Sequence, residues 1–145
     1  MKLPAALTLA LVATPVLADW ERVEAEGTVS EVADRLETAV TEAGATVFAR
    51  VNHAEGAASV QMDLPEAELL IFGNPQLGTP AMQQDIRAGV MLPLRVLVAD
   101  VEGQTVLIYQ EVEEMFDETD VDDDADFVEA MEDALETLTE RAARG

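Results

Sequence analysis

The strand candidates in the middle of this chain are apolar at successive positions rather than at alternate ones. The segment 67–73 places leucine, isoleucine and phenylalanine on both sides of a strand, and the hairpin expected at 93–110 has the same character. A sheet with one face in water alternates apolar and polar residues, and each large apolar side chain gains about 1.5–3 kcal/mol on burial. We therefore expect the second face of the sheet to be covered by segment 74–92, by a second subunit or by a ligand.

The helix expected at residues 29–43 has the clearest pattern in the chain. Its apolar residues recur at helical spacing, Thr28 and Glu31 fit a capping box, and Gly44 stands where the helix ends. The whole chain then reads as strand, helix, strand, short helix, strand, short helix, hairpin and helix. This order predicts an α+β fold with a single, mostly antiparallel sheet and helices packed on one face.

A turn-rich segment follows the most apolar strand. Gly73-Asn74-Pro75 ends that strand, and Thr79 followed by Pro80 is predicted to be the N-cap and first residue of a short helix. The apolar side of this helix is expected to consist of Met82, Ile86 and Val90. Backbone N–H groups at its start can hold an anion, although the missing N–H of Pro80 and the charge of the chain oppose this.

Residues 1–18 have the pattern of a secretory signal peptide. Lys2 gives a positive start, the apolar stretch is too short for a membrane span of about 20 residues, and small residues precede the expected cleavage site. We expect an exported protein, periplasmic or secreted, with no membrane span after cleavage. The remainder divides into an α+β domain at 19–112 and an acidic loop with an extra C-terminal amphipathic helix at 113–145.

The charge of the chain restricts its partners. Without Lys2 there are seven arginines against thirty acidic residues, which gives a net charge of −23. Such a surface repels nucleic acid and anionic membranes, and suits a divalent cation, a basic protein or simply a salty or acidic habitat. The sequence has no cysteine, so disulfides, thiol catalysis and iron–sulfur clusters are excluded.

Three blocks of the chain resemble the family known as domain of unknown function 302. They are "FARVNHA" at 48–54, "ELLIFGNP" at 68–75 and "GTPAM" at 78–82. Ala81 stands where the family usually has leucine. The resemblance covers about residues 21–110 and implies a β-α-β4-α fold of the TATA-binding-protein-like type, commonly a homodimer, with no settled activity. The chain departs from the family after Tyr109, where its acidic ending replaces a shorter one.

The chain has one histidine, His53, which is either a ligand and acid–base group or a structural hydrogen-bonding residue. It is expected to share a small polar pocket with its neighbours and with the turn-rich corner. The ligand-binding candidates are Asn52, His53, Glu55, Asn74, Gly78 and Thr79. Neither serine of the exported chain lies in a nucleophile elbow, so catalysis is not expected.

The acidic loop at 117–126 partly resembles a calcium-binding loop. Asp120, Asp122 and Asp124 take the first, third and fifth positions of an EF-hand. Ala125 and Met131 stand where the EF-hand needs glycine and glutamate. Weak divalent-cation binding and a solvated tether remain as alternatives, and no other cofactor is expected.

Three functions are compatible with these patterns. The first is a non-catalytic, dimeric module that binds a small molecule or a partner protein through its second sheet face or the corner near Asn74. The second is an accessory protein whose acidic segment contacts a basic protein partner. The third is a periplasmic enzyme that uses His53.

Overall fold

The computed structural model describes residues 20–145, so the predicted signal peptide lies outside the described residues. The strands are β1 (Trp20–Glu24), β2 (Thr46–Asn52), β3 (Ala67–Gly73), β4 (Leu94–Val101) and β5 (Gln104–Gln110). The helices are α1 (Val29–Glu42), α2 (His53–Ser59), α3 (Pro75–Gln84), α4 (Ala88–Met91), α5 (Val112–Phe116) and α6 (Asp126–Ala143). The order of strands, helices and hairpin agrees with the order expected from the sequence, except that α4 and α5 are two further short helices that the sequence did not predict.

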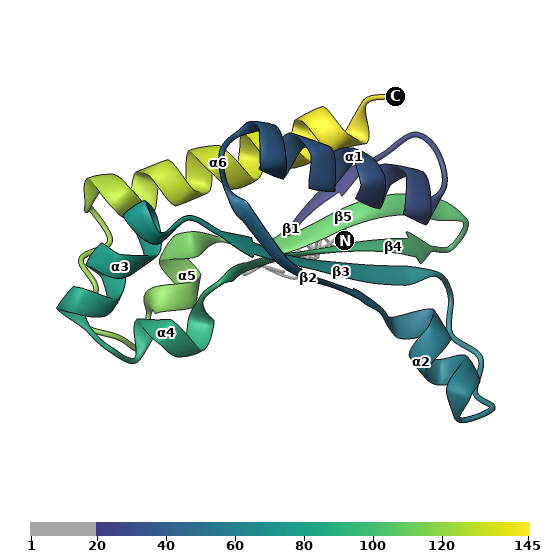
Figure 1. Ribbon diagram of the computed structural model, residues 1–145, viewed down its shortest axis with the longest axis horizontal. Helices are drawn as coiled ribbons and strands as arrows, with labels where there is room; N and C mark the ends of the chain where they lie inside the picture. The colour runs from purple at the N-terminus through teal and green to yellow at the C-terminus, as the bar shows by residue number, and fades with distance from the viewer. Residues whose placement is uncertain (1–19) are drawn as a thin grey trace, which may run out of the picture.

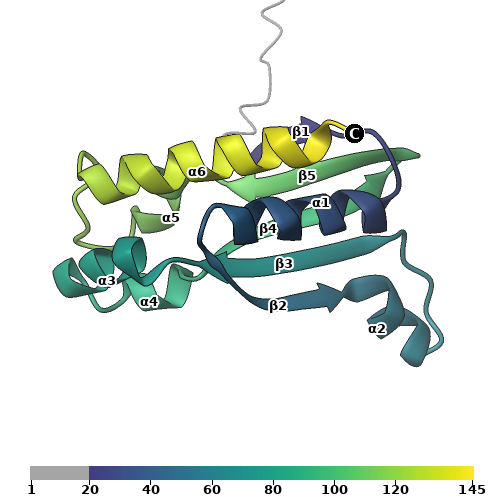
Figure 2. The same cartoon turned by 45° about the horizontal axis from the view of Figure 1, so that its top comes forward.

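The five strands form one antiparallel sheet in the order β1-β5-β4-β3-β2. Helices α1 and α6 lie side by side across one face of this sheet (Figures 1 and 2). The predicted α+β fold with helices on one face is thereby confirmed. We call the opposite face of the sheet, which no described helix lies across, the open face.

Helix α1 begins where the sequence predicts. The Thr28 hydroxyl accepts the Glu31 N–H at 3.3 Å, and the Glu31 carboxylate accepts the Thr28 N–H at 2.9 Å, which is a complete capping box. The helix packs its apolar side onto the sheet. The largest fully buried side chains of the core include Leu36, Leu70, Phe72, Val96, Leu107 and Leu135.

Helix α6 belongs to the same core as the sheet. Its buried residues are Val128, Met131, Leu135, Leu138, Thr139, Ala142 and Ala143. They belong to one hydrophobic cluster with α1 and the sheet, so the segment 113–145 shares the core of residues 19–112. Arg35 of α1 adds a polar link, because its Nε donates to the Ala142 carbonyl at 2.8 Å.

Two local backbone features shape the sheet. Strands β4 and β5 are joined by a two-residue turn in which Glu102 and Gly103 have φ angles of 58° and 86°, as a type I′ hairpin requires. This turn lies within the hairpin predicted at 93–110. In β2, the register shifts between Val47 and Ala49, which marks a bulge next to Phe48.

The segment 74–92 lies at one end of the sheet and does not cover the open face (Figure 1). This part of the sequence prediction is wrong, because helix α3 begins at Pro75 and already ends at Gln84. Ile86 and Val90 are 77% and 73% exposed, so the predicted apolar side that joined them to Met82 does not form. Of the three covers considered for the second face, a second subunit and a ligand remain.

Candidate functional site

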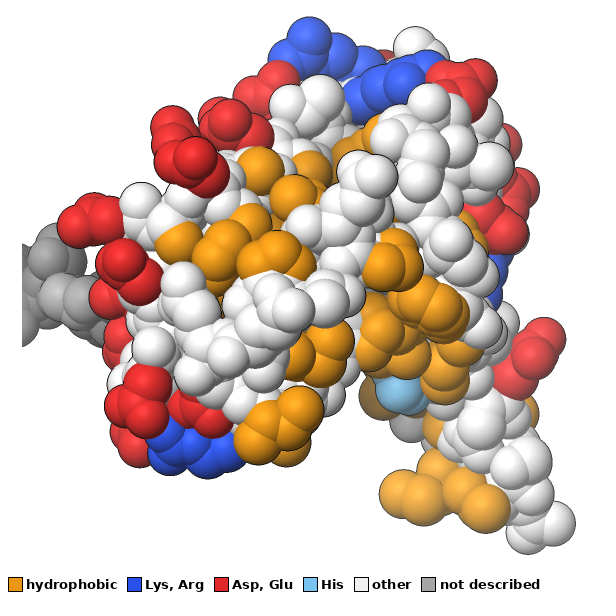
Figure 3. All heavy atoms as spheres, turned by 60° about the vertical axis from the view of Figure 1, so that its left-hand side comes forward, with side chains coloured by type: hydrophobic (Ala, Val, Ile, Leu, Met, Phe, Trp, Pro, Cys, Tyr) orange, Lys and Arg blue, Asp and Glu red, His pale blue; other side chains and the backbone are white. Residues whose placement is uncertain are grey.

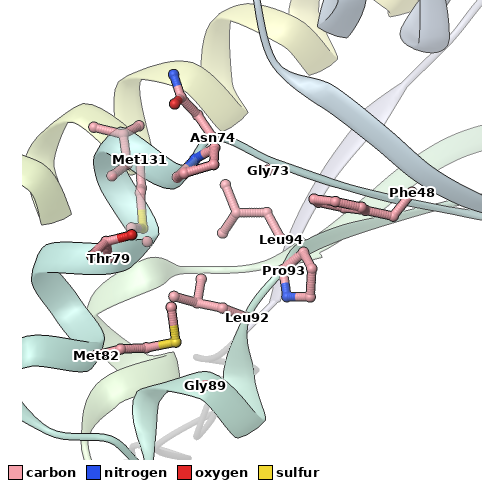
Figure 4. Close-up of a pocket in the computed structure, with 13 residues that line it drawn as sticks. Phe48, Gly73, Asn74, Thr79, Met82, Gly89, Leu92, Pro93, Leu94 and Met131 are labelled. Atoms are coloured by element: carbon pink, nitrogen blue, oxygen red, sulfur yellow. The ribbon is translucent and has the colours of Figure 1, made fainter.

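A cavity of about 280 Å³ lies at the end of the sheet where β3 passes into α3. Its walls come from segments far apart in the chain: the β2 bulge, the β3–α3 corner, the start of β4 and helix α6 (Figure 4). The lining residues are Phe48, Gly73, Asn74, Pro75, Leu77, Gly78, Thr79, Met82, Gly89, Leu92, Pro93, Leu94 and Met131. The cavity is close in size to the lower end of small-molecule sites.

The corner that builds the cavity is held by Asn74. Its side-chain oxygen accepts the Gln76 N–H at 2.9 Å, and its carbonyl accepts the N–H groups of Leu77 and Gly78 at 3.0 Å each. Asn74, and not Thr79, is therefore the N-cap of this helix, and the prediction for Thr79 is wrong. The cap lies directly after β3 because Pro75 suits the first helical position.

Two glycines keep the cavity open. A Cβ atom on Gly78 would lie 3.5 Å from the Leu92 side chain, and one on Gly89 would lie 3.1 Å from the Met82 sulfur. The space between α3 and the start of β4 is therefore open because Gly78 and Gly89 have no side chains to fill it. A larger residue at Gly78 would extend into it.

The lining of the cavity is apolar and uncharged. None of the described residues that line it is titratable, and only Asn74 and Thr79 carry polar side chains. The Asn74 amide points away from the cavity, whereas the Thr79 hydroxyl lies beside the Met131 side chain (Figure 4). Such a lining can hold an apolar molecule and offer it one hydroxyl, but it contains no acid, base or charged nucleophile.

The predicted polar pocket does not form, because its members lie at opposite ends of the sheet. Asn74, Gly78 and Thr79 all line the cavity. Strands β2 and β3 are antiparallel, with Thr46 opposite Gly73 and Asn52 opposite Glu68. At about 3.3 Å per residue, Asn52 is therefore roughly 20 Å from the cavity end of the sheet.

The other three candidates, Asn52, His53 and Glu55, lie at the start of α2. The Asn52 side chain accepts the Glu55 N–H at 2.9 Å and so caps the helix. His53 is the first residue of α2 and is exposed, and it is not among the residues that line the cavity. The interpretation of His53 as part of a shared site with Asn74 is wrong.

The aspartates of the acidic loop do not converge on a metal site. Among residues 20–145, no group of three or more acidic or histidine side chains is placed to hold a metal ion. Asp120 contacts Arg87 at 3.2 Å, whereas the Asp122 carboxylate accepts the Asp124 N–H at 3.2 Å. The loop is instead fixed to the body of the protein through its backbone, since the Asp122 N–H donates to the Gln84 side chain at 2.8 Å.

Asp85 is the main anchor of this loop. Its largely buried carboxylate accepts the backbone N–H groups of Arg87 and Asp120, both at 2.9 Å, and contacts the Arg87 guanidinium at 2.6 Å. The hydrogen bonds from Arg87, followed by that from Asp120, hold the pKa of Asp85 well below its usual range. The carboxylate therefore stabilises the fold as long as it is ionised.

We expect Asp85→Asn to lower the free energy of unfolding at neutral pH. In acid, we expect the variant and the parent protein to be about equally stable. A depressed pKa in the folded state contributes stability above the unfolded pKa of about 3.9 and loses it as the pH falls further. The urea midpoints of the two proteins should therefore differ at neutral pH and approach each other below a pH of about 4. The exposed Asp123 gives a control, Asp123→Asn. An Asp85→Asn midpoint equal to that of the control at neutral pH would contradict the anchoring role.

A second polar cluster joins β2 to α1 and β3. Arg50 contacts Asp34 at 2.6 Å and Glu37 at 3.4 Å, and its Nε donates to the buried Glu68. The hydrogen bond that Arg50 donates to Glu68, with a further one that it donates to Asp34, raises the pKa of Arg50. This cluster links β2, α1 and β3, and Arg50 therefore has a structural role.

Sequence reasoning missed most of the cavity lining. It places Phe48, Pro93 and Leu94 in strands, Leu92 in the segment before the hairpin, and Met131 in the last helix, and it assigns none of them to a binding site. The available signal was the pair of glycines Gly73 and Gly78 around Asn74, which implies close approach of the backbone to another element. That pattern does not say which element approaches.

Two kinds of known proteins are similar to this chain. The fluoride-specific ion channels FluC 1 of Brucella suis biovar 1 (strain 1330) and of Brucella abortus biovar 1 (strain 9-941) are each 43% identical to it over 75 residues, which is 52% of this chain. The chain thus matches only 30% and 28% of the length of those relatives. Within residues 20–145, no helix is long and apolar enough to cross a membrane.

The fold has a counterpart among solved structures. An uncharacterized conserved DUF302 protein from Bacillus stearothermophilus superposes with a TM-score of 0.78 at 18% identity, over 85% of this chain and 97% of that one. The family model described as "Domain of unknown function DUF302" matches residues 21–141. The match includes most of α6, which the sequence resemblance had left outside its range of about 21–110. The chain belongs to the family described as domain of unknown function DUF302.

Proposed function

We propose that this protein is a non-catalytic binding module that holds a small, uncharged and largely apolar molecule in the cavity between α3, α6 and the start of β4. The observation that carries this proposal is the lining, which is apolar around a space of about 280 Å³ and has no titratable side chain. The Thr79 hydroxyl supplies a hydrogen-bond donor or acceptor that can orient the ligand.

The charge of the protein supports the choice of an uncharged ligand. A charged molecule in this cavity would lose its hydration without gaining an ionic partner. An anion would also be repelled by a chain with a net charge of −22. Export to the periplasm or beyond remains part of the proposal on the sequence pattern of residues 1–18. Channel activity, which the names of the Brucella relatives state for those proteins, is no part of it.

A matched pair of fluorescent probes tests the proposal. We expect neutral N-phenyl-1-naphthylamine to bind the chain in a 1:1 ratio, and its sulfonated form, anilinonaphthalene sulfonate, to bind at least about tenfold more weakly because of its charge. Equal binding of the two probes, or no saturable binding of the neutral one, would contradict the proposal. Native mass spectrometry of the purified protein then identifies any molecule that it retains.

The variant Gly78→Leu should weaken binding of the neutral probe by at least about tenfold, because the new side chain enters the cavity. The control is Gly56→Leu in α2, where an added Cβ meets nothing within 4 Å. Both changes replace a helical glycine and so raise helix propensity alike. Unchanged binding by Gly78→Leu with a retained melting temperature would place the ligand elsewhere.

A further inference from the structure

The segment between β2 and β3, residues 53–66, projects from the body of the protein, and we call it the arm. Figure 1 shows that it leaves the end of the sheet on the side away from α1 and α6. Helix α2 has no buried residue, and every residue from 58 to 66 is exposed. The arm nevertheless carries Val60, Met62 and Leu64 at exposed fractions of 64%, 66% and 48%.

The arm has a defined conformation despite its exposure. The Val60 N–H and the Met62 N–H both donate to the Ala57 carbonyl, at 3.1 and 3.0 Å, which closes the end of α2. Gln61 has a positive φ of 61° within this turn. Val60 and Met62 are therefore presented on a fixed turn, with Leu64 two residues beyond it, and no described part of the same chain buries these three side chains.

The open face is the apolar surface next to the arm. Trp20, Phe48 and Val51 on the two edge strands are exposed. Half-buried apolar side chains lie between them on the inner strands, namely Leu69, Ile71, Leu97 and Ile108. Figure 3 shows hydrophobic side chains gathered around the hollow between the arm and the body. A patch of this kind is typical of an interaction site.

The charges of the two surfaces are complementary. Arg22 lies opposite Ile108 and Arg95 opposite Ile71, which places both on the open face. They are the two arginines of residues 20–145 without an acidic or carbonyl partner. The arm carries three exposed acidic residues that form no ion pair within the described chain: Glu55, Asp63 and Glu66.

We propose that the arm of one copy docks on the open face of a second copy, so that two copies exchange arms around a two-fold axis. The arm of a single chain projects beyond the end of its own sheet, and it leaves at the end where Glu24, the acidic strand residue of the open face, is also placed. A second copy brings the apolar turn and its acids onto the apolar strands and the two free arginines. With two-fold symmetry, each arm is buried on the open face of the other copy, so both arms and both open faces are covered.

The interface shares Phe48 with the lining of the cavity, but the interface residues chosen for substitution, namely Arg22, Met62, Asp63, Glu66 and Arg95, do not line it. Loss of the dimer and loss of ligand are therefore measured separately. The second copy is preferred over a membrane because the acids of the arm oppose an anionic bilayer.

Sedimentation velocity of the chain beginning at Asp19, which contains the whole of the described core, tests the proposal. We expect a dimer at micromolar concentration and at least a tenfold weaker dimer for Met62→Glu. The control is Val90→Glu on α4, another exposed apolar residue, which belongs to neither the arm nor the sheet and should leave the dimer unchanged. A monomeric parent chain, or a Met62→Glu dimer as tight as the control, would overturn the proposal.

A charge exchange distinguishes arm docking from any other dimer. The face variant Arg22→Glu/Arg95→Glu and the arm variant Asp63→Arg/Glu66→Arg should each sediment as monomers. The chain that combines all four changes should recover the dimer, because each arm again meets opposite charges on the other copy. Dimers in both double variants, or a monomeric combined variant that still unfolds cooperatively, would overturn the proposal.

Discussion

A chain that ends at Gln110 is expected to lose cooperative folding. It lacks α5 and α6, which together bury ten residues in the core. Burial of each large apolar side chain is worth about 1.5–3 kcal/mol, whereas a whole domain is stable by only about 5–15 kcal/mol. The uncovered side of α1 and half of the sheet would then face water. Circular dichroism during a urea titration should show no sigmoidal transition.

The full-length variant Leu135→Ala tests the contribution of α6 to the core with a smaller change. Leu135 is 1% exposed, and its truncation should lower the free energy of unfolding by about 2–5 kcal/mol while the transition stays cooperative. If the shortened chain unfolded with the midpoint of the full chain, α6 would be an appendage and not part of the core.

Arg50→Met should be the most destabilising substitution of a charged residue in this protein. The change leaves the carboxylate of Glu68, which is 9% exposed, without its cationic partner. Removing one partner of a buried ion pair typically costs about 3–5 kcal/mol. The second change Glu68→Met in the same chain should recover much of this loss, because the buried charge is then gone as well.

The matched control for Arg50 is Arg141→Met. Arg141 pairs with Glu42 at the surface, and both side chains are 55% exposed. Such a pair is worth about 0–1 kcal/mol. Free energies of unfolding from urea titrations compare the two variants directly. An Arg50→Met loss no larger than that of Arg141→Met would show that Glu68 is adequately solvated without the arginine.

The fold could be predicted from the sequence because its signals are local. The Thr28–Glu31 capping box, the apolar spacing of α1 and the turn at Glu102 and Gly103 each specify a structure within a few residues. The successive apolar positions of β3, β4 and β5 predict that both faces of the sheet are covered; within the described chain α1 and α6 cover one of them, and the cover of the open face stays a prediction. The resemblance of the segments around Asn52 and Asn74 to domain of unknown function 302 implied the order in which these strands and helices follow one another.

The site was harder to predict because it depends on which ends of the strands meet. Asn52 follows the carboxyl end of β2 and Asn74 follows that of β3. In a parallel pair these two corners would be neighbours, but in the antiparallel pair they lie at opposite ends of the sheet. The position of the cavity also depends on Leu92, which approaches Gly78, and on Met131 of α6, which lines the same cavity. No local pattern encodes these tertiary contacts.

The N-cap of α3 shows a second limit. Thr79-Pro80 and Asn74-Pro75 are both good helix starts, and the sequence favours neither strongly. The structure uses the earlier one, and Pro80 is then accommodated inside the helix. The earlier start brings the helix directly against the end of the strand, which is what encloses the cavity.

The bulge in β2 has a consequence for how this protein behaves at high concentration. An exposed edge strand is a template on which further strands can add, and this is a common route to fibres. Here one edge of the sheet is the bulged β2 and the other is the short β1, which carries Glu21, Arg22 and Glu24. Neither edge presents a regular, uncharged ladder to another strand. The folded protein should therefore resist fibril formation in concentrated solution, even though much of its sheet is apolar on both faces.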